Sequence, residues 1–210
     1  YGYGTSPGQR FRHLCQCAMR ARQRKNEVKR TLSWLLILWC AASDPAVHAQ
    51  EGERLNQFKA VFMYNFVDYL SWPSQDGEKA SEFTIGLLGH TPIEALLNKI
   101  AEKKKVGGRQ LRVVTYTDIE QLGSCQMLFV TSAFTQHLDD LKQRLGSRNV
   151  LTVSDSPGLA ERGVAINFVV VEGKLKFEIN TMTLKKAGLR ASSQLLKLAT
   201  LIPVPVTESP

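Results

Sequence analysis

The sequence predicts a single α/β domain with a mainly parallel sheet, flanking helices and a C-terminal antiparallel hairpin. Short apolar strands alternate with helical segments between residues 83 and 153, which is typical of right-handed crossovers between parallel strands. A strongly apolar helical repeat precedes the first strand, and two alternating strands joined by Glu172-Gly173 follow the last one. The predicted domain spans residues 50–202, which is long enough to bury a core of its own.

Residues 1–49 have the features of a secretory leader. Residues 20–30 are cationic, an apolar run follows at residues 32–42, and Val47-His48-Ala49 places small or compact residues before an expected cleavage after Ala49. We therefore expect a signal peptide, with Met19 as the candidate start, and export to the periplasm. An uncleaved membrane anchor is the alternative, and it is disfavoured because the run is short for a span of ~20 residues.

The charge distribution argues against a nucleic-acid partner. The chain has a formal net charge of +8, but residues 50–210 hold nineteen basic and seventeen acidic residues, a net of only +2. Counterion release on a nucleic acid requires a clustered cationic face, and most of the basicity belongs to the leader.

Cys125 is the one cysteine after residue 49, since Cys15, Cys17 and Cys40 all lie in the leader. The mature domain therefore has no second thiol for an internal disulfide, even in an oxidising compartment. Because Cys125 opens an apolar run at residues 126–130, we expect a buried free thiol rather than a reactive one.

A long helix opens the predicted domain. Apolar side chains recur along it at three- and four-residue spacing: Leu55, Phe58, Phe62, Phe66 and Tyr69. This pattern predicts about twenty helical residues that are too apolar to lie on a surface alone. The helix is expected to stop at Trp72-Pro73, because proline disfavours helical geometry in the residue before it.

The following strands and helices are short. Strands are expected at residues 83–89, 111–116, 127–130 and 150–153. Thr91-Pro92-Ile93-Glu94 predicts a capping box that starts a helix, and Gly107-Gly108 predicts the turn after that helix. A helical turn is expected at residues 117–120, and leucine spacing over residues 138–145 predicts another helix.

The C-terminal part departs from this alternation. Residues 165–171 and 174–179 predict the two strands of the hairpin, with one polar and one packed face. Asn180 is the expected cap of a helix that stops at Gly188, and Ser192 or Ser193 is the expected cap of the last helix. Residues 203–210 are predicted to be a disordered tail.

Groups for catalysis or metal binding are sparse. His90 lies at a strand-to-helix turn, where open α/β sheets place ligands, whereas His137 fits a helix surface. No Cys/His cluster has metal-ligand spacing, and Ser154-Asp155-Ser156 is more typical of a turn than of a nucleophile. We therefore predict that the protein is not an enzyme and has no cofactor or bound metal.

Short stretches of the domain follow one another in a distinctive order and spacing. They are residues 58–60, 64–66, 72–73, 83–89, 125–130, 150–155, 163, 166–168, 177–180, 188–189, 192–193 and 195–196. Each stretch is weakly specific alone, but through their order and spacing the chain resembles, from about Phe58 to Ile202, the YfiR family of bacterial periplasmic regulators.

The resemblance implies a regulatory function. Members are exported to the periplasm and repress an inner-membrane diguanylate cyclase by binding its periplasmic domain, and an outer-membrane lipoprotein can sequester them. Release of the cyclase raises cyclic di-GMP and promotes biofilm formation. Some members carry disulfides thought to sense redox state, and Cys125 alone puts such a role in doubt here. We also expect a homodimer.

Partner binding requires an exposed apolar patch, which we expect at Tyr69, Trp72, Phe168 and Phe177. The alternative is that these side chains form the core, and for the two phenylalanines this alternative is the better supported. The second functional hypothesis is a small-molecule pocket where Gly89, His90 and Ser154 meet, and a hydrolase using Ser154 or Ser156 ranks below both. The full set of candidate partner- or ligand-binding residues is Tyr69, Trp72, Pro73, His90, Ser154, Asn167, Phe168, Phe177 and Asn180.

Overall fold

The computed structural model of the protein describes residues 45–73 and 82–203. Most of the predicted leader, and the predicted tail beyond Pro203, lie outside the described residues. The contacts within the chain divide it into two compact units, Tyr1–Gln50 and Glu51–Pro210. The fold described below is that of the second unit. Within the described residues, no helix combines the length and the apolar character needed to cross a membrane.

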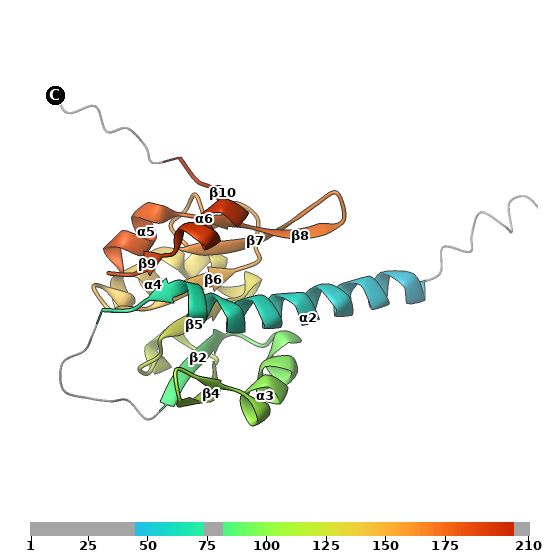
Figure 1. The fold of residues 1–210 in the computed structure, drawn as a ribbon, viewed down its shortest axis with the longest axis horizontal. Helices are drawn as coiled ribbons and strands as arrows, with labels where there is room; N and C mark the ends of the chain where they lie inside the picture. The colour runs from blue at the N-terminus through green and yellow to red at the C-terminus, as the bar shows by residue number, and fades with distance from the viewer. Residues whose placement is uncertain (1–44, 74–81, 204–210) are drawn as a thin grey trace, which may run out of the picture. The chain divides into compact units, whose positions relative to one another are not determined.

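The domain is built on one eight-stranded mixed sheet with strand order β10-β8-β7-β6-β5-β2-β4-β3 (Figure 1). Its strands are β2 (Glu82–Leu88), β3 (Lys105–Val106), β4 (Arg109–Tyr116), β5 (Met127–Val130), β6 (Leu151–Ser154), β7 (Ile166–Val171), β8 (Lys174–Ile179) and β10 (Thr200–Leu201). A separate two-stranded sheet pairs β1 (Leu70–Ser71) with β9 (Arg190–Ala191).

The sheet is parallel in its centre and mixed toward both edges. Strands β4, β2, β5, β6 and β7 pair in parallel, and so do β8 and β10. The pairs β3–β4 and β7–β8 are antiparallel. The prediction of an α/β domain with a C-terminal hairpin is confirmed, and the prediction of a mainly parallel sheet is matched in part, because the β3–β4 hairpin adds an antiparallel edge that the sequence pattern did not indicate.

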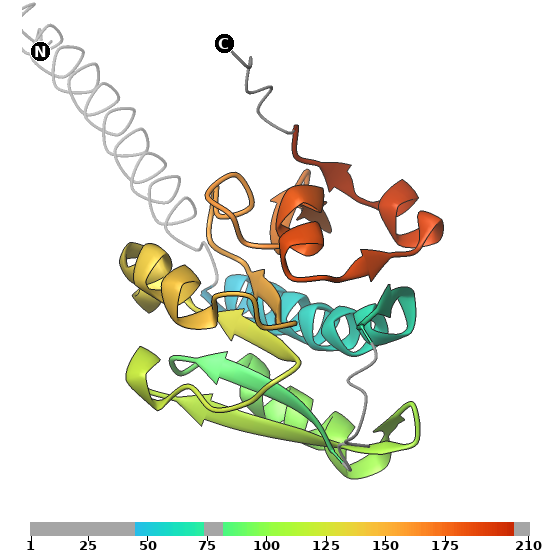
Figure 2. The same cartoon turned by 90° about the vertical axis from the view of Figure 1, so that its left-hand side faces the viewer.

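Two buried apolar clusters lie on the two faces of the sheet. Because side chains alternate along a strand, Met127 and Phe129 of β5 belong to one cluster and Leu128 and Val130 to the other. The first cluster is covered by α2 (Pro45–Tyr69), α3 (Ile93–Lys103), α5 (Thr181–Lys186) and α6 (Ser193–Leu198). The second is covered by η1 (Ile119–Gln121) and α4 (Leu138–Leu145), and η2 (Ser132–His137) packs beside it. Both views show α2 lying against the sheet (Figures 1 and 2).

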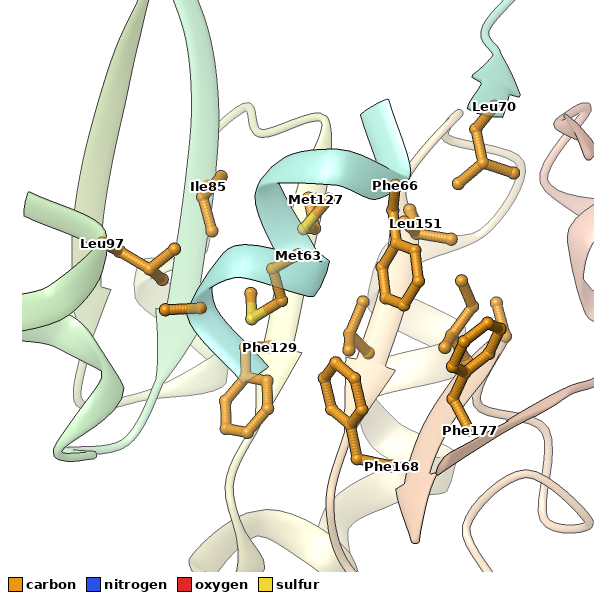
Figure 3. Close-up of a cluster of buried hydrophobic side chains, with 14 of the residues drawn as sticks. Met63, Phe66, Leu70, Ile85, Leu97, Met127, Phe129, Leu151, Phe168 and Phe177 are labelled. Carbon is orange, nitrogen blue, oxygen red and sulfur yellow. The ribbon is translucent and has the colours of Figure 1, made fainter. Parts of the chain in front are cut away.

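The long helix α2 is the main cover of the first cluster. Its inward-facing Met63 and Phe66 are 0% and 1% exposed and lie over the strands (Figure 3). The helix ends at Tyr69, earlier than predicted, because Leu70–Ser71 leave the helix to pair with β9. That pairing involves residues about 120 positions apart in the chain, so local spacing could not reveal it.

Helix caps are confirmed in part. Asn180 accepts a hydrogen bond from the Thr183 amide, as predicted. Of the two serines expected to cap the last helix, Ser192 is the cap and accepts from the Leu195 amide. The capping box predicted before α3 is wrong. The Glu94 amide donates to the backbone oxygen of Thr91, and the Thr91 hydroxyl accepts from the Ile93 amide at 3.4 Å instead. The last helix is shorter than its apolar pattern predicted, since it ends at Leu198 and Thr200–Leu201 form β10 beside β8.

The C-terminal hairpin forms as predicted. Glu172 and Gly173 have φ values of 52° and 71°, the positive values that a two-residue type I′ turn requires. The resulting register places Phe168 opposite Phe177 and Asn167 opposite Glu178. This register decides where several of the candidate site residues lie.

Candidate partner-binding surface

Helix α2 exposes an apolar stripe on its outer face. Phe58, Val61 and Tyr69 are separated by three and eight positions, which places them on the same side of a helix. They are 44%, 48% and 39% exposed, whereas Met63 and Phe66 on the opposite side are buried. We call Phe58, Val61 and Tyr69 the α2 outer stripe. Of this stripe, only Tyr69 was expected on the surface, because apolar residues recur all around the helix and their spacing does not separate its inner face from its outer face.

Trp72 and Pro73 continue from the end of this stripe. The Trp72 ring packs edge-on against Phe83 at a centroid distance of 5.4 Å, and its Nε1 donates to the backbone oxygen of Gln126 at 3.3 Å. Trp72 is therefore half-buried and anchored, while Pro73 is exposed. Tyr69 accepts a backbone hydrogen bond from Ser192, which ties this end of α2 to the start of α6.

The structure separates the residues of the expected small-molecule pocket. His90 is exposed after β2, and Ser154 is fully buried at the end of β6, with β5 lying between the two strands. Thr131 and Phe134 pack against Gly89 and fill the space beside it. Asn167 is buried next to Ser154, its Nδ2 donates to Glu178 at 3.3 Å, and its Oδ1 has no partner among the described residues.

The serine hydroxyls are poorly placed for the hydrolase hypothesis. Ser154 Oγ donates to the backbone oxygen of Val130 at 2.8 Å and accepts from the Ser156 amide at 3.3 Å. Ser156 Oγ is also buried, and within the described residues neither hydroxyl bonds to a histidine. A hydroxyl needs both a base and access to substrate to act as a nucleophile. The described part of the chain likewise holds no group of three or more residues that could bind a metal ion.

Phe168 and Phe177 lie in the core and are 2% and 4% exposed. Phe66 stacks on Phe168 at 5.8 Å and meets Phe177 edge-on at 5.3 Å (Figure 3). Phe62 contacts both rings. The core alternative, which the sequence favoured for these two residues, is confirmed, because the hairpin register turns their side chains toward α2. Asn180 is half-buried, and beyond its cap its Nδ2 donates to the backbone oxygen of Ala160.

Sequence reasoning missed an ion pair that joins α2 to the sheet. Lys59 Nζ lies 2.7 Å from Asp155 Oδ2, and the two side chains are only 13% and 28% exposed. Lys59 sits within the apolar repeat of α2, and Asp155 directly follows β6. A charged residue inside an otherwise apolar stripe was the available signal, since such a residue needs a partner when it is shielded from water.

Cys125 is buried and unpaired, as predicted. Burial raises the pKa of its thiol to about 11. In the chain from Gln50 onward, we expect a thiol reagent at pH 8 to react with Cys125 at least roughly a hundredfold more slowly in native protein than in guanidinium, because the thiolate is the reactive form. Labelling at equal rates in both states would contradict the burial.

The raised pKa of Cys125 also makes the stability of the protein depend on pH. The folded state keeps the thiol proton up to a higher pH than the unfolded chain does, so the contribution of Cys125 to stability should fall as pH rises from about 8.5 to about 11.

Comparison with known proteins identifies the family. The sequence profile described as YfiR/HmsC-like matches residues 56–200. No curated protein sequence matches the chain significantly. Among solved structures, the chain is similar to an ABC domain from Streptococcus pneumonia in complex with L-Trp, at 12% sequence identity and a TM-score of 0.43, over 57% of this chain and 55% of that one. The chain thus spans about half of that protein, and so distant a likeness is evidence for neither fold nor function. The family match covers most of the described residues and confirms the resemblance found in the sequence: the chain belongs to the YfiR/HmsC-like family.

Proposed function

We propose that the protein is a periplasmic regulator that binds the periplasmic domain of an inner-membrane diguanylate cyclase and represses it, thereby lowering cyclic di-GMP. The observation that carries the proposal is the family match over residues 56–200. The leader features of residues 1–49 support export, with cleavage after Ala49. In the same scheme, an outer-membrane lipoprotein competes for the regulator, and the regulator acts as a homodimer without catalysing a reaction.

The surface that we propose for the cyclase is the α2 outer stripe together with Pro73. Three large apolar side chains are exposed on one helix face, and exposed apolar side chains grouped on one face are used for protein contacts. The Lys59–Asp155 pair and the buried inner face hold α2 in place, so the stripe is rigid before binding. A rigid surface loses little conformational entropy on association. Repression then requires tighter binding to the inactive state of the cyclase than to its active state.

The proposal is tested with the variant Val61→Asp/Tyr69→Ala. Both side chains are exposed, so the fold should be retained. In the complex, the new carboxylate at position 61 would be buried against the partner and the aromatic contact of Tyr69 would be lost, so binding to the periplasmic cyclase domain should weaken by at least roughly a hundredfold. Biolayer interferometry measures the affinity, and cellular cyclic di-GMP should rise when the variant replaces the wild type.

Val170→Asp is the matched control, because Val170 is 52% exposed at the end of the hairpin and lies outside the proposed surface. It should bind the cyclase domain as the wild type does. Failure of the wild-type protein to bind any such cyclase domain would overturn the regulatory proposal. Binding that the double variant retains would overturn the assignment of the surface.

A further inference from the structure

A cleft of about 660 Å³ opens between α4 and α5, away from the α2 outer stripe. Its volume lies within the range of about 300–1,000 Å³ that small-molecule sites occupy. Apolar side chains form much of the lining: Leu145, Val150, Met182, Ala187, Ile202 and Pro203. The α4–α5 cleft therefore offers apolar contact area that the proposed partner surface does not use.

The charges around the cleft are mainly positive. Lys142, Arg148, Arg162 and Lys186 line it, and Glu161 is the one acidic residue among the lining residues. This excess contrasts with residues 50–210 as a whole, whose basic and acidic residues are nearly balanced. The cationic side chains are thus concentrated beside an apolar lining, which is the arrangement that complements a molecule with one anionic group and an apolar body.

Two of these cations are available to a ligand. Lys142 is held by Asp139 at 2.8 Å, and Arg162 donates to the backbone oxygen of Thr135 at 2.9 Å. Among the described residues, the side chains of Arg148 and Lys186 are exposed and take part in none of the hydrogen bonds or ion pairs. Arg148 follows α4 and Lys186 belongs to α5, so the two come from opposite walls of the cleft.

We propose that the α4–α5 cleft binds a small anionic amphiphile, whose acidic group contacts Arg148 and Lys186 and whose apolar part lies on the Leu145–Val150 and Met182–Ile202 walls. An isolated anion lacks the apolar contact, and an apolar molecule without charge leaves the cations without a partner. Binding requires both parts of the ligand. This site is independent of the cyclase surface, because the two share no residue.

Decanoate, below its micelle concentration, is the probe for isothermal titration calorimetry on the full chain. Wild-type protein should bind decanoate saturably. Arg148→Gln/Lys186→Gln should weaken binding by at least roughly tenfold, because a charge-assisted contact is lost at each position. Lys174→Gln/Lys176→Gln removes the same charge from the exposed part of β8 and should leave the affinity within about twofold of the wild type.

Met182→Glu provides a second test that does not threaten the fold. Met182 is 37% exposed in the first turn of α5, where an acidic side chain suits the helix dipole. The new carboxylate should repel decanoate while thermal unfolding remains at the wild-type temperature. Acetate and decyltrimethylammonium should each bind far more weakly than decanoate. The proposal is overturned if wild-type protein shows no saturable binding, if Arg148→Gln/Lys186→Gln binds like the wild type, or if decyltrimethylammonium binds as tightly as decanoate.

Discussion

Replacing Phe66 with alanine should cost roughly 3–5 kcal/mol of the free energy of unfolding, as expected for truncation of a fully buried aromatic side chain. Phe66 is 1% exposed, and its ring lies beside those of Phe168 and Phe177 (Figure 3). The ring of Phe62 also contacts it, at a centroid distance of 6.2 Å. The truncation removes the contact between α2 and the β7–β8 hairpin. It leaves a cavity between them that the strands of the hairpin cannot move to fill. A domain of this size has only about 5–15 kcal/mol of stability, so a large part of it should be lost.

Phe58→Ala is the matched control for this prediction. Phe58 lies two turns earlier on the same helix and is 44% exposed, so its truncation should cost less than about 1 kcal/mol. Urea denaturation followed by circular dichroism measures both variants. Equal losses for the two phenylalanines would contradict the inward orientation of Phe66.

Replacing Gly89 with alanine should cost roughly 2–4 kcal/mol, through two additive causes. Gly89 has a φ of 92°, which strains any residue with a Cβ. The added Cβ would also lie 2.3 Å from Thr131 Oγ1, a hydroxyl that is buried and donates to the backbone oxygen of Leu88 at 2.7 Å. Either the backbone moves or this hydrogen bond is lost.

Two further variants separate these causes. Gly158→Ala combines a φ of 72° with open space around the Cβ, so it should show the conformational cost alone, about 1 kcal/mol. Adding Thr131→Ala to Gly89→Ala should recover part of the loss, because the clashing hydroxyl is gone. If Gly89→Ala proves no more destabilising than Gly158→Ala in denaturant titrations, the close approach of Thr131 to Gly89 is wrong.

Candidate site residues could be predicted only in part. Tyr69 was correctly placed on the surface, and Asn180 was correctly interpreted as a helix cap, because each depends on neighbours within a few positions. For Phe168 the sequence favoured the core and left the surface open, because alternation gives two faces without saying which is covered. The α4–α5 cleft was not foreseen, since its lining combines segments from residue 142 to residue 203.

By itself, the sequence determined the local features of this protein: the order of the main helices and strands from α2 to β8, the Glu172-Gly173 turn, the cap at Asn180, and the family. These depend on backbone preferences and short hydrogen bonds, which a few adjacent residues fix. Tertiary structure alone decided the β1–β9 pairing that ends α2, the Lys59–Asp155 pair, and which apolar side chains remain on the surface. Such contacts join residues far apart in the chain, and the free energy of burying one face against another selects them only after all the elements have come together.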